Sequence, residues 1–134
     1  MRRLSGLTAV LTIAFIAVSC GGGGGDGVGG PPPPPPPPPT CPTNTFCMTI
    51  SNTFSPATLT VPVGTTVSWR NDAGSLHNVT WNSAAGRTAA QAGDGTGDIT
   101  DFSTGTHTRL FNTTGTFAFT CTIHPGMNGT LTVQ

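Results

Sequence analysis

The sequence contains no lysine and no glutamate, and residues 41–134 show no helical periodicity. Beyond the N-terminal leader, three arginines stand against five aspartates, a formal charge of −2: Arg70, Arg87 and Arg109 against Asp26, Asp72, Asp94, Asp98 and Asp101. Such a chain lacks the basic patch that nucleic-acid binding requires, so we expect no nucleic-acid partner. It also provides no strong field for steering a charged partner.

The N-terminus has the pattern of an export signal. A short basic segment (1–3) precedes an apolar run (7–18) that is too short to span a membrane. The run ends in Ala-Val-Ser-Cys20-Gly21, which resembles the lipobox of bacterial lipoproteins, although the usual leucine is replaced by Ala17. We therefore expect a lipoprotein signal peptide over residues 1–19 and lipid attachment at Cys20. A plain signal peptide with a chance cysteine at its end is the alternative.

Residues 20–40 cannot bury apolar surface and are predicted to be a tether. Residues 21–30 are nearly all glycine, and residues 31–39 are nine consecutive prolines. A glycine run is a flexible coil, whereas a polyproline II rod of this length extends about 28 Å. A stalk after a lipidated cysteine predicts an exported protein held at the cell envelope; because Gly21 is not an aspartate-type retention signal, we favour the outer membrane. A proline-rich ligand for a recognition domain is the alternative.

Residues 41–134 are predicted to be one small all-β domain. Short runs rich in Val, Thr, Phe and Ile predict seven strands, near 46–51, 57–61, 65–70, 78–82, 106–112, 116–120 and 129–133. The segment 83–100 is predicted to be a long mobile loop. Apolar residues alternate with Thr or Ser, as a sheet with one buried face requires. The expected core is Met48, Ile50, Phe54, Leu59, Val61, Val67, Trp69, Val79, Trp81, Leu110, Phe117, Phe119, Leu131 and Val133.

Four cysteines in an exported chain suggest disulfide chemistry. With Cys20 assigned to lipid, Cys41 and Cys47 lie close enough in sequence to form a local disulfide. Cys121 is then a solitary thiol in an oxidising compartment, where metal ligation would protect it. The alternative is that Cys121 pairs with Cys41 or Cys47 and leaves the other cysteine free.

The last twenty residues contain a thiol, an imidazole and a thioether at regular spacing. Cys121, His124 and Met127 lie on one short loop between two β-runs, and His77 stands near the start of an earlier strand. One strong thiolate, imidazole ligands and a weak thioether are the donor set of a blue copper site. Met127 as core filler is the alternative. The third histidine, His107, is interpreted as a solvated strand residue.

The C-terminal loop, the His-Asn-Val run at His77 and the stretch from Phe54 to Trp69 resemble the cupredoxin family of plastocyanins and amicyanin. The resemblance implies a Greek-key β-sandwich of about seven to eight strands. It also implies one copper ion bound by His77, Cys121, His124 and Met127, with Asn78 tying its loop to the Cys loop through Thr122. Ile123 and Thr120 depart from the usual family residues, which affects tuning of the potential rather than the ligand set.

The predicted function is that of a blue copper, one-electron carrier and not an enzyme, since no acid–base pair stands around an open metal position. Redox proteins are expected to dock near His124, and the carrier is expected to be a monomer anchored by lipid in the periplasm or cell envelope. A copper-delivery module is an alternative, although three Met and three His suit it poorly. A metal-free interaction domain is the second alternative.

Overall fold

The computed structural model describes residues 40–134. The predicted signal peptide (1–19), the lipid-attachment cysteine Cys20 and the tether up to residue 39 lie outside the described residues. Within the described part, no helix is long and apolar enough to cross a membrane.

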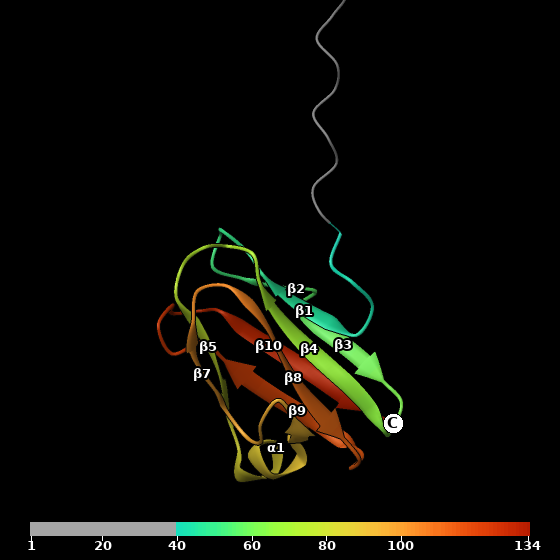
Figure 1. Cartoon of the computed structure of the whole chain (residues 1–134). Helices are drawn as coiled ribbons and strands as arrows, with labels where there is room; N and C mark the ends of the chain where they lie inside the picture. The colour runs from blue at the N-terminus through green and yellow to red at the C-terminus, as the bar shows by residue number, and fades with distance from the viewer. Residues whose placement is uncertain (1–39) are drawn as a thin grey trace, which may run out of the picture. The chain divides into compact units, whose positions relative to one another are not determined.

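Residues 40–134 form two five-stranded β-sheets that pack face to face (Figure 1). In spatial order the first sheet contains β2 (Phe54–Ser55), β1 (Thr45–Met48), β4 (Thr65–Asn71), β8 (Gly105–Phe111) and β6 (Gln91–Gly93). The second contains β3 (Thr58–Val61), β10 (Asn128–Val133), β9 (Gly115–Thr120), β5 (His77–Trp81) and β7 (Ile99–Phe102). The predicted all-β sandwich is therefore confirmed, and the strands beyond the seven expected are the short β2, β6 and β7.

Strand register in the second sheet brings two distant parts of the sequence together. β5 and β9 are antiparallel, and Thr80 lies opposite Thr120. Since antiparallel partners run in opposite directions, the start of β5 at His77 must lie beside the residues that follow Thr120. Figure 1 shows this arrangement, with the red β9–β10 loop next to the beginning of β5.

The core between the sheets is dominated by aromatic rings. Trp69 of the first sheet stacks on Phe46 at 5.6 Å between ring centroids, and it forms T-shaped pairs with Trp81 and Phe119 of the second sheet at 5.8 and 5.7 Å. All four side chains are buried. Edge-to-face and stacked pairs at these distances add to the stabilisation from burying the rings themselves.

Two of the expected core residues lie elsewhere. Ile50 is 84% exposed, because β1 ends at Met48 and the chain turns, with the Asn52 N–H donating to the Thr49 carbonyl. Leu110 is only half-buried, and its neighbours Arg109 and Phe111 point inward instead. The prediction therefore assigned the wrong set of alternating β8 residues to the buried face.

The buried arginine explains that error. The Arg109 guanidinium donates to the carbonyls of Gly97 and Asp98 at 3.1 and 2.9 Å and pairs with Asp94 at 2.7 Å. A buried charge is tolerated when its donors are satisfied in this way. The side chain thus anchors the segment between β6 and β7 against the first sheet.

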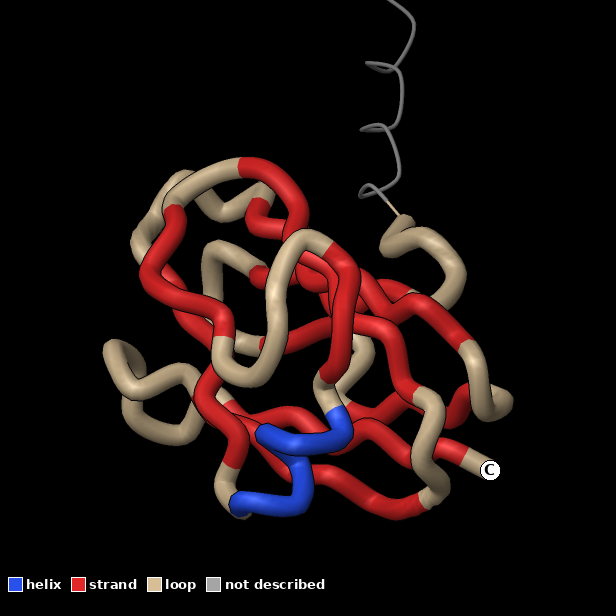
Figure 2. The backbone as a smooth tube through the Cα atoms, turned by 60° about the horizontal axis from the view of Figure 1, so that its bottom comes forward, coloured by secondary structure: helices blue, strands red, loops and turns tan. Residues whose placement is uncertain are grey.

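The segment 83–100 is structured, contrary to the prediction of a long loop. It contains helix α1 (Ala84–Ala89), the blue element in Figure 2, followed by β6 and the start of β7. Ser83 begins the helix, since its hydroxyl accepts a hydrogen bond from the Gly86 N–H at 3.1 Å. Its low apolar content misled the prediction, because the helix is short and buries only small residues.

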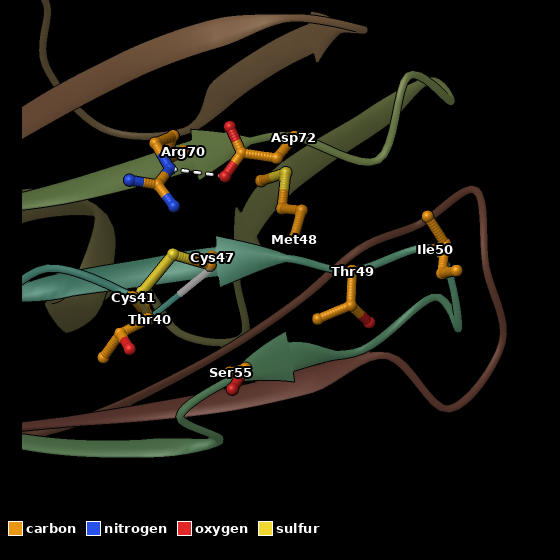
Figure 3. A pocket seen from close by; sticks show the side chains of 9 residues that line it. All are labelled: Thr40, Cys41, Cys47, Met48, Thr49, Ile50, Ser55, Arg70 and Asp72. Atoms are coloured by element: carbon orange, nitrogen blue, oxygen red, sulfur yellow. Dashed lines mark hydrogen bonds and ion pairs between the residues drawn. A yellow bond between two sulfur atoms is a disulfide. The ribbon is translucent and has the colours of Figure 1, made fainter. Parts of the chain in front are cut away.

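Cys41 and Cys47 form a disulfide. Cys47 alternates with the inward Phe46 and Met48, so the bridge lies on the outer face of the first sheet and ties the start of the domain to β1. A cavity of about 670 Å³ opens there beside Ile50 and the Arg70–Asp72 ion pair (Figure 3). None of the four predicted copper ligands lines this cavity.

Candidate metal centre

Three predicted ligands meet at one end of the second sheet. The Cys121 Sγ lies 3.9 Å from Nδ1 of His77 and 3.7 Å from Nδ1 of His124. One ligand atom from each of the three residues lies within 4.8 Å of the other two. The imidazole rings of His77 and His124 are 4.6 Å apart between centroids. Cys121 is the free cysteine of residues 40–134, and it is buried.

His77 is held without any contact with solvent. Its side chain is 0% exposed, and its Nε2 lies 3.0 Å from the Ser75 hydroxyl, which leaves Nδ1 facing the thiol. Burial lowers the pKa of His77, and the neighbouring His124 lowers it further. A neutral imidazole offers a lone pair, which a metal ligand must have.

The β9–β10 loop curls back on itself, so its side chains converge. The Cys121 N–H donates to the Met127 carbonyl at 2.9 Å, and the Met127 N–H donates to the His124 carbonyl at 3.2 Å. Gly126 has a φ of +84°, a backbone conformation that glycine adopts without strain. The loop therefore folds back toward Cys121, and Met127 at its far end is buried with 0% exposure.

Asn78 joins the His77 strand to the Cys121 loop. Its Oδ1 accepts from the Thr122 N–H at 2.8 Å, and its Nδ2 donates to the Thr122 hydroxyl at 2.7 Å. The second Nδ2 hydrogen reaches Asp101 of β7 at 2.9 Å. The contact between Asn78 and Thr122 is the one that the family resemblance implies.

The third histidine lies outside this cluster. His107 pairs with Asp94 at 2.5 Å and packs edge-on against Phe102 at 4.6 Å between ring centroids. Burial alone would raise the pKa of Asp94, but bonds from the Thr108 N–H and His107, with the charge of Arg109, lower it overall. The pair is thus an electrostatic contact on the first sheet.

The donor set fits one copper ion. Two atoms bonded to the same metal at about 2.0–2.3 Å lie roughly 3.5–4 Å apart, and both sulfur–nitrogen separations fall within that range. A single buried thiol with two imidazoles, and a buried thioether on the same loop as the thiol, is the combination typical of blue copper sites. The thioether belongs to Met127.

Comparison with known proteins agrees with this chemistry. The family described as copper binding proteins, plastocyanin/azurin family, matches residues 48–134. The chain belongs to this family. Together with the cluster of His77, Cys121 and His124, membership makes this cupredoxin a blue copper electron-transfer protein and not an enzyme.

Individual relatives support the assignment. This cupredoxin is 33% identical to a plastocyanin of Scenedesmus fuscus over 84 residues, covering 60% of this chain and 86% of the relative. A methionine-to-alanine mutant of amicyanin in its Cu(I) form superposes with a TM-score of 0.56 at 22% identity, covering 69% and 82% of the two chains. A purple cupredoxin from Nitrosopumilus maritimus gives 0.51 at 24% identity, covering 67% and 98%. The two structures support the fold.

Several polar partners of the cupredoxin site had no signal in the sequence. Asp101 and Ser75 lie in segments where small and polar residues are common, and neither has a distinctive spacing to the ligands. Their roles depend on β7 and on the β4–β5 loop lying beside β5. Only the folded chain shows that arrangement.

Proposed function

We propose that His77, Cys121, His124 and Met127 together bind the copper ion of this electron carrier. The observation that carries the proposal is the convergence of three donor atoms within 4.8 Å, from two strand ends that lie 44 residues apart in sequence. When bound, copper supplies a one-electron Cu(II)/Cu(I) couple. The protein provides fixed ligands and excludes water from His77 and Cys121. The site therefore changes little between the two oxidation states, which keeps the reorganisation energy of electron transfer small.

The visible absorption spectrum of the Cu(II)-loaded domain tests the ligand set. We expect an intense band in the orange-red that disappears in Cys121→Ser. His107→Gln is the matched control, since this histidine lies outside the cluster, and it should leave the band unchanged. A band that survives in Cys121→Ser, or disappears in His107→Gln, would contradict the assignment.

We infer that electrons enter and leave next to His124. This ligand is only partly buried, and the apolar side chains that precede the two histidines, Leu76 and Ile123, are 46% and 37% exposed. Exposed apolar side chains next in sequence to the two histidine ligands suit a small, transient docking surface for a redox protein. The near-neutral charge of the chain gives a charged partner little steering, which is consistent with apolar contact.

Electron self-exchange between Cu(I) and Cu(II) forms, followed by NMR line broadening, tests this surface without a known partner. A charge in the contact should slow exchange, so we expect lower rates for Leu76→Lys and Ile123→Lys. Val63→Lys is the matched control, because Val63 is also 46% exposed but lies between β3 and β4. Equal rates in all three variants would rule out docking near His124.

We propose further that the carrier is an exported, monomeric lipoprotein. In this account residues 1–19 are removed, and the lipid on Cys20 anchors the chain in the outer membrane. Residues 20–40 form the tether, and residues 41–134 form the copper domain in the periplasm. The Cys41–Cys47 disulfide supports an oxidising compartment. Expression of the full chain in a two-membrane bacterium should place it in the membrane fraction, whereas Cys20→Ala should be released. Equal fractionation of the two would refute the anchor.

A further inference from the structure

We propose that Ser75 is a positioning residue that keeps the hydrogen of His77 on Nε2, so that Nδ1 offers its lone pair to the copper ion. The proposal rests on the ligand role of His77 proposed above. The two ring nitrogens have different neighbours: Nδ1 faces the Cys121 Sγ at 3.9 Å, whereas Nε2 lies 3.0 Å from the Ser75 Oγ. His77 is 0% exposed, so solvent does not contact its ring in the folded protein.

The chemistry of a neutral imidazole makes this arrangement selective. Such a ring carries one N–H and one lone pair, and the metal requires the lone pair. With Nδ1 toward the thiol, Nε2 must carry the hydrogen and the Ser75 hydroxyl must accept it. Ligand histidines generally use their second nitrogen in this manner, which orients the ring and increases its basicity. Without an acceptor, the buried Nε2–H would be left unpaired. That loss favours the other tautomer, in which Nδ1 carries the hydrogen and offers no lone pair to the metal.

A second side chain holds Ser75 in place. Asn71, at the end of β4, is 3% exposed, and its Nδ2 donates to the carbonyls of Ser75 at 2.9 Å and Phe102 at 2.8 Å. Its Oδ1 accepts from the Ala73 N–H at 3.1 Å. Phe102 lies directly opposite His77 in the β5–β7 pairing. One buried amide therefore connects the loop that carries Ser75 to the strand next to His77.

The tautomer of His77 can be measured in the metal-free protein from the ¹⁵N chemical shifts of its ring. We expect wild type to carry its hydrogen on Nε2, and Ser75→Ala to show a mixture of tautomers. Ser75→Thr keeps the hydroxyl and should restore the wild-type pattern. Ser51→Ala is the matched control, because Ser51 is an exposed turn residue whose side chain makes no hydrogen bond within the described part of the chain.

Copper affinity, measured by competition with a chelator, provides the second readout. Loss of such a hydrogen-bond partner typically weakens metal binding about 10–100-fold, so Ser75→Ala should fall in that range while Ser75→Thr and Ser51→Ala stay close to wild type. An Nδ1–H tautomer in wild type would overturn the proposal even if Ser75→Ala does not fold. So would a Ser75→Ala protein with the wild-type tautomer and affinity. Wild type with the Nε2–H tautomer but no copper binding would support the role of Ser75 and refute the ligand set.

Discussion

Replacing Asn78 by alanine should separate the two halves of the metal site and lower stability markedly. Asn78 is 7% exposed and makes three hydrogen bonds, two with Thr122 and one with Asp101. A neutral hydrogen bond contributes about 0.5–1.5 kcal/mol net. The bond to the Asp101 carboxylate belongs to a stronger class, but Asp101 is exposed and solvent weakens it. The three together predict a loss of about 3 kcal/mol in the free energy of unfolding.

Urea unfolding of the metal-free domain, followed by fluorescence of the buried Trp69 and Trp81, measures this loss. A loss of about 3 kcal/mol corresponds to a fall of roughly 12–24 °C in the melting temperature of a small domain. Thr122→Val removes one of the three bonds and should cost about 1 kcal/mol. Asn112→Ala is the control, since this asparagine is exposed; surface changes of this kind usually stay within about 0.5 kcal/mol.

The comparison between variants is what makes the test decisive. If Asn78→Ala costs less than about 1 kcal/mol, the three bonds do not hold the strand and the loop together as reasoned. If Thr122→Val costs as much as Asn78→Ala, the stability resides in the threonine side chain alone. In either case the account of Asn78 as the link between β5 and the Cys121 loop would be wrong.

Three further predictions concern packing, pH and metal. Gly129→Ala places a Cβ inside the contact distance of the Phe119 ring, so it should cost about 1–3 kcal/mol in urea unfolding, whereas Thr130→Ala should cost less. The lowered pKa of Asp94 contributes stability that is present above its unfolded pKa and lost as pH falls through the folded value. Unfolding midpoints below about pH 4 should therefore fall more steeply in wild type than in Asp94→Asn, and parallel curves would contradict this. Copper at 100 times its Kd should raise the unfolding free energy of wild type by about 2.7 kcal/mol, and a chelator should reverse this gain. Copper should not change the unfolding free energy of Cys121→Ser. An equal gain in that variant would contradict the proposed site.

Much of the fold was predictable because it depends on local patterns. Alternation of apolar residues with Thr marked β4, β5, β9 and β10 within a few residues of their observed bounds. The pairing of Cys41 with Cys47 followed from their closeness in sequence, and the structure contains this disulfide. These features need only neighbouring residues, since strand periodicity and short-loop closure are set by the backbone nearby.

Other features could not be predicted from local patterns. An arginine in an alternating run is normally read as facing solvent, yet Arg109 points inward because carbonyls of the β6–β7 segment fold over it. Ile50 fits a strand by composition, but the chain turns before reaching it. The segment 83–100 has little apolar content, and a six-residue helix that buries only small residues leaves almost no periodic signal.

The sequence by itself determined the chemistry of this cupredoxin: a thiol, an imidazole and a thioether on one loop, and a second histidine that could join them. Side-chain donors and their spacing within a loop are written directly in the order of residues. Only the tertiary structure decided that His77 reaches that loop, that Nδ1 is its facing nitrogen, and that Ser75, Asn71 and Asp101 hold the parts in place. These contacts depend on strand register and sheet pairing, which the whole chain settles together through the burial of its core.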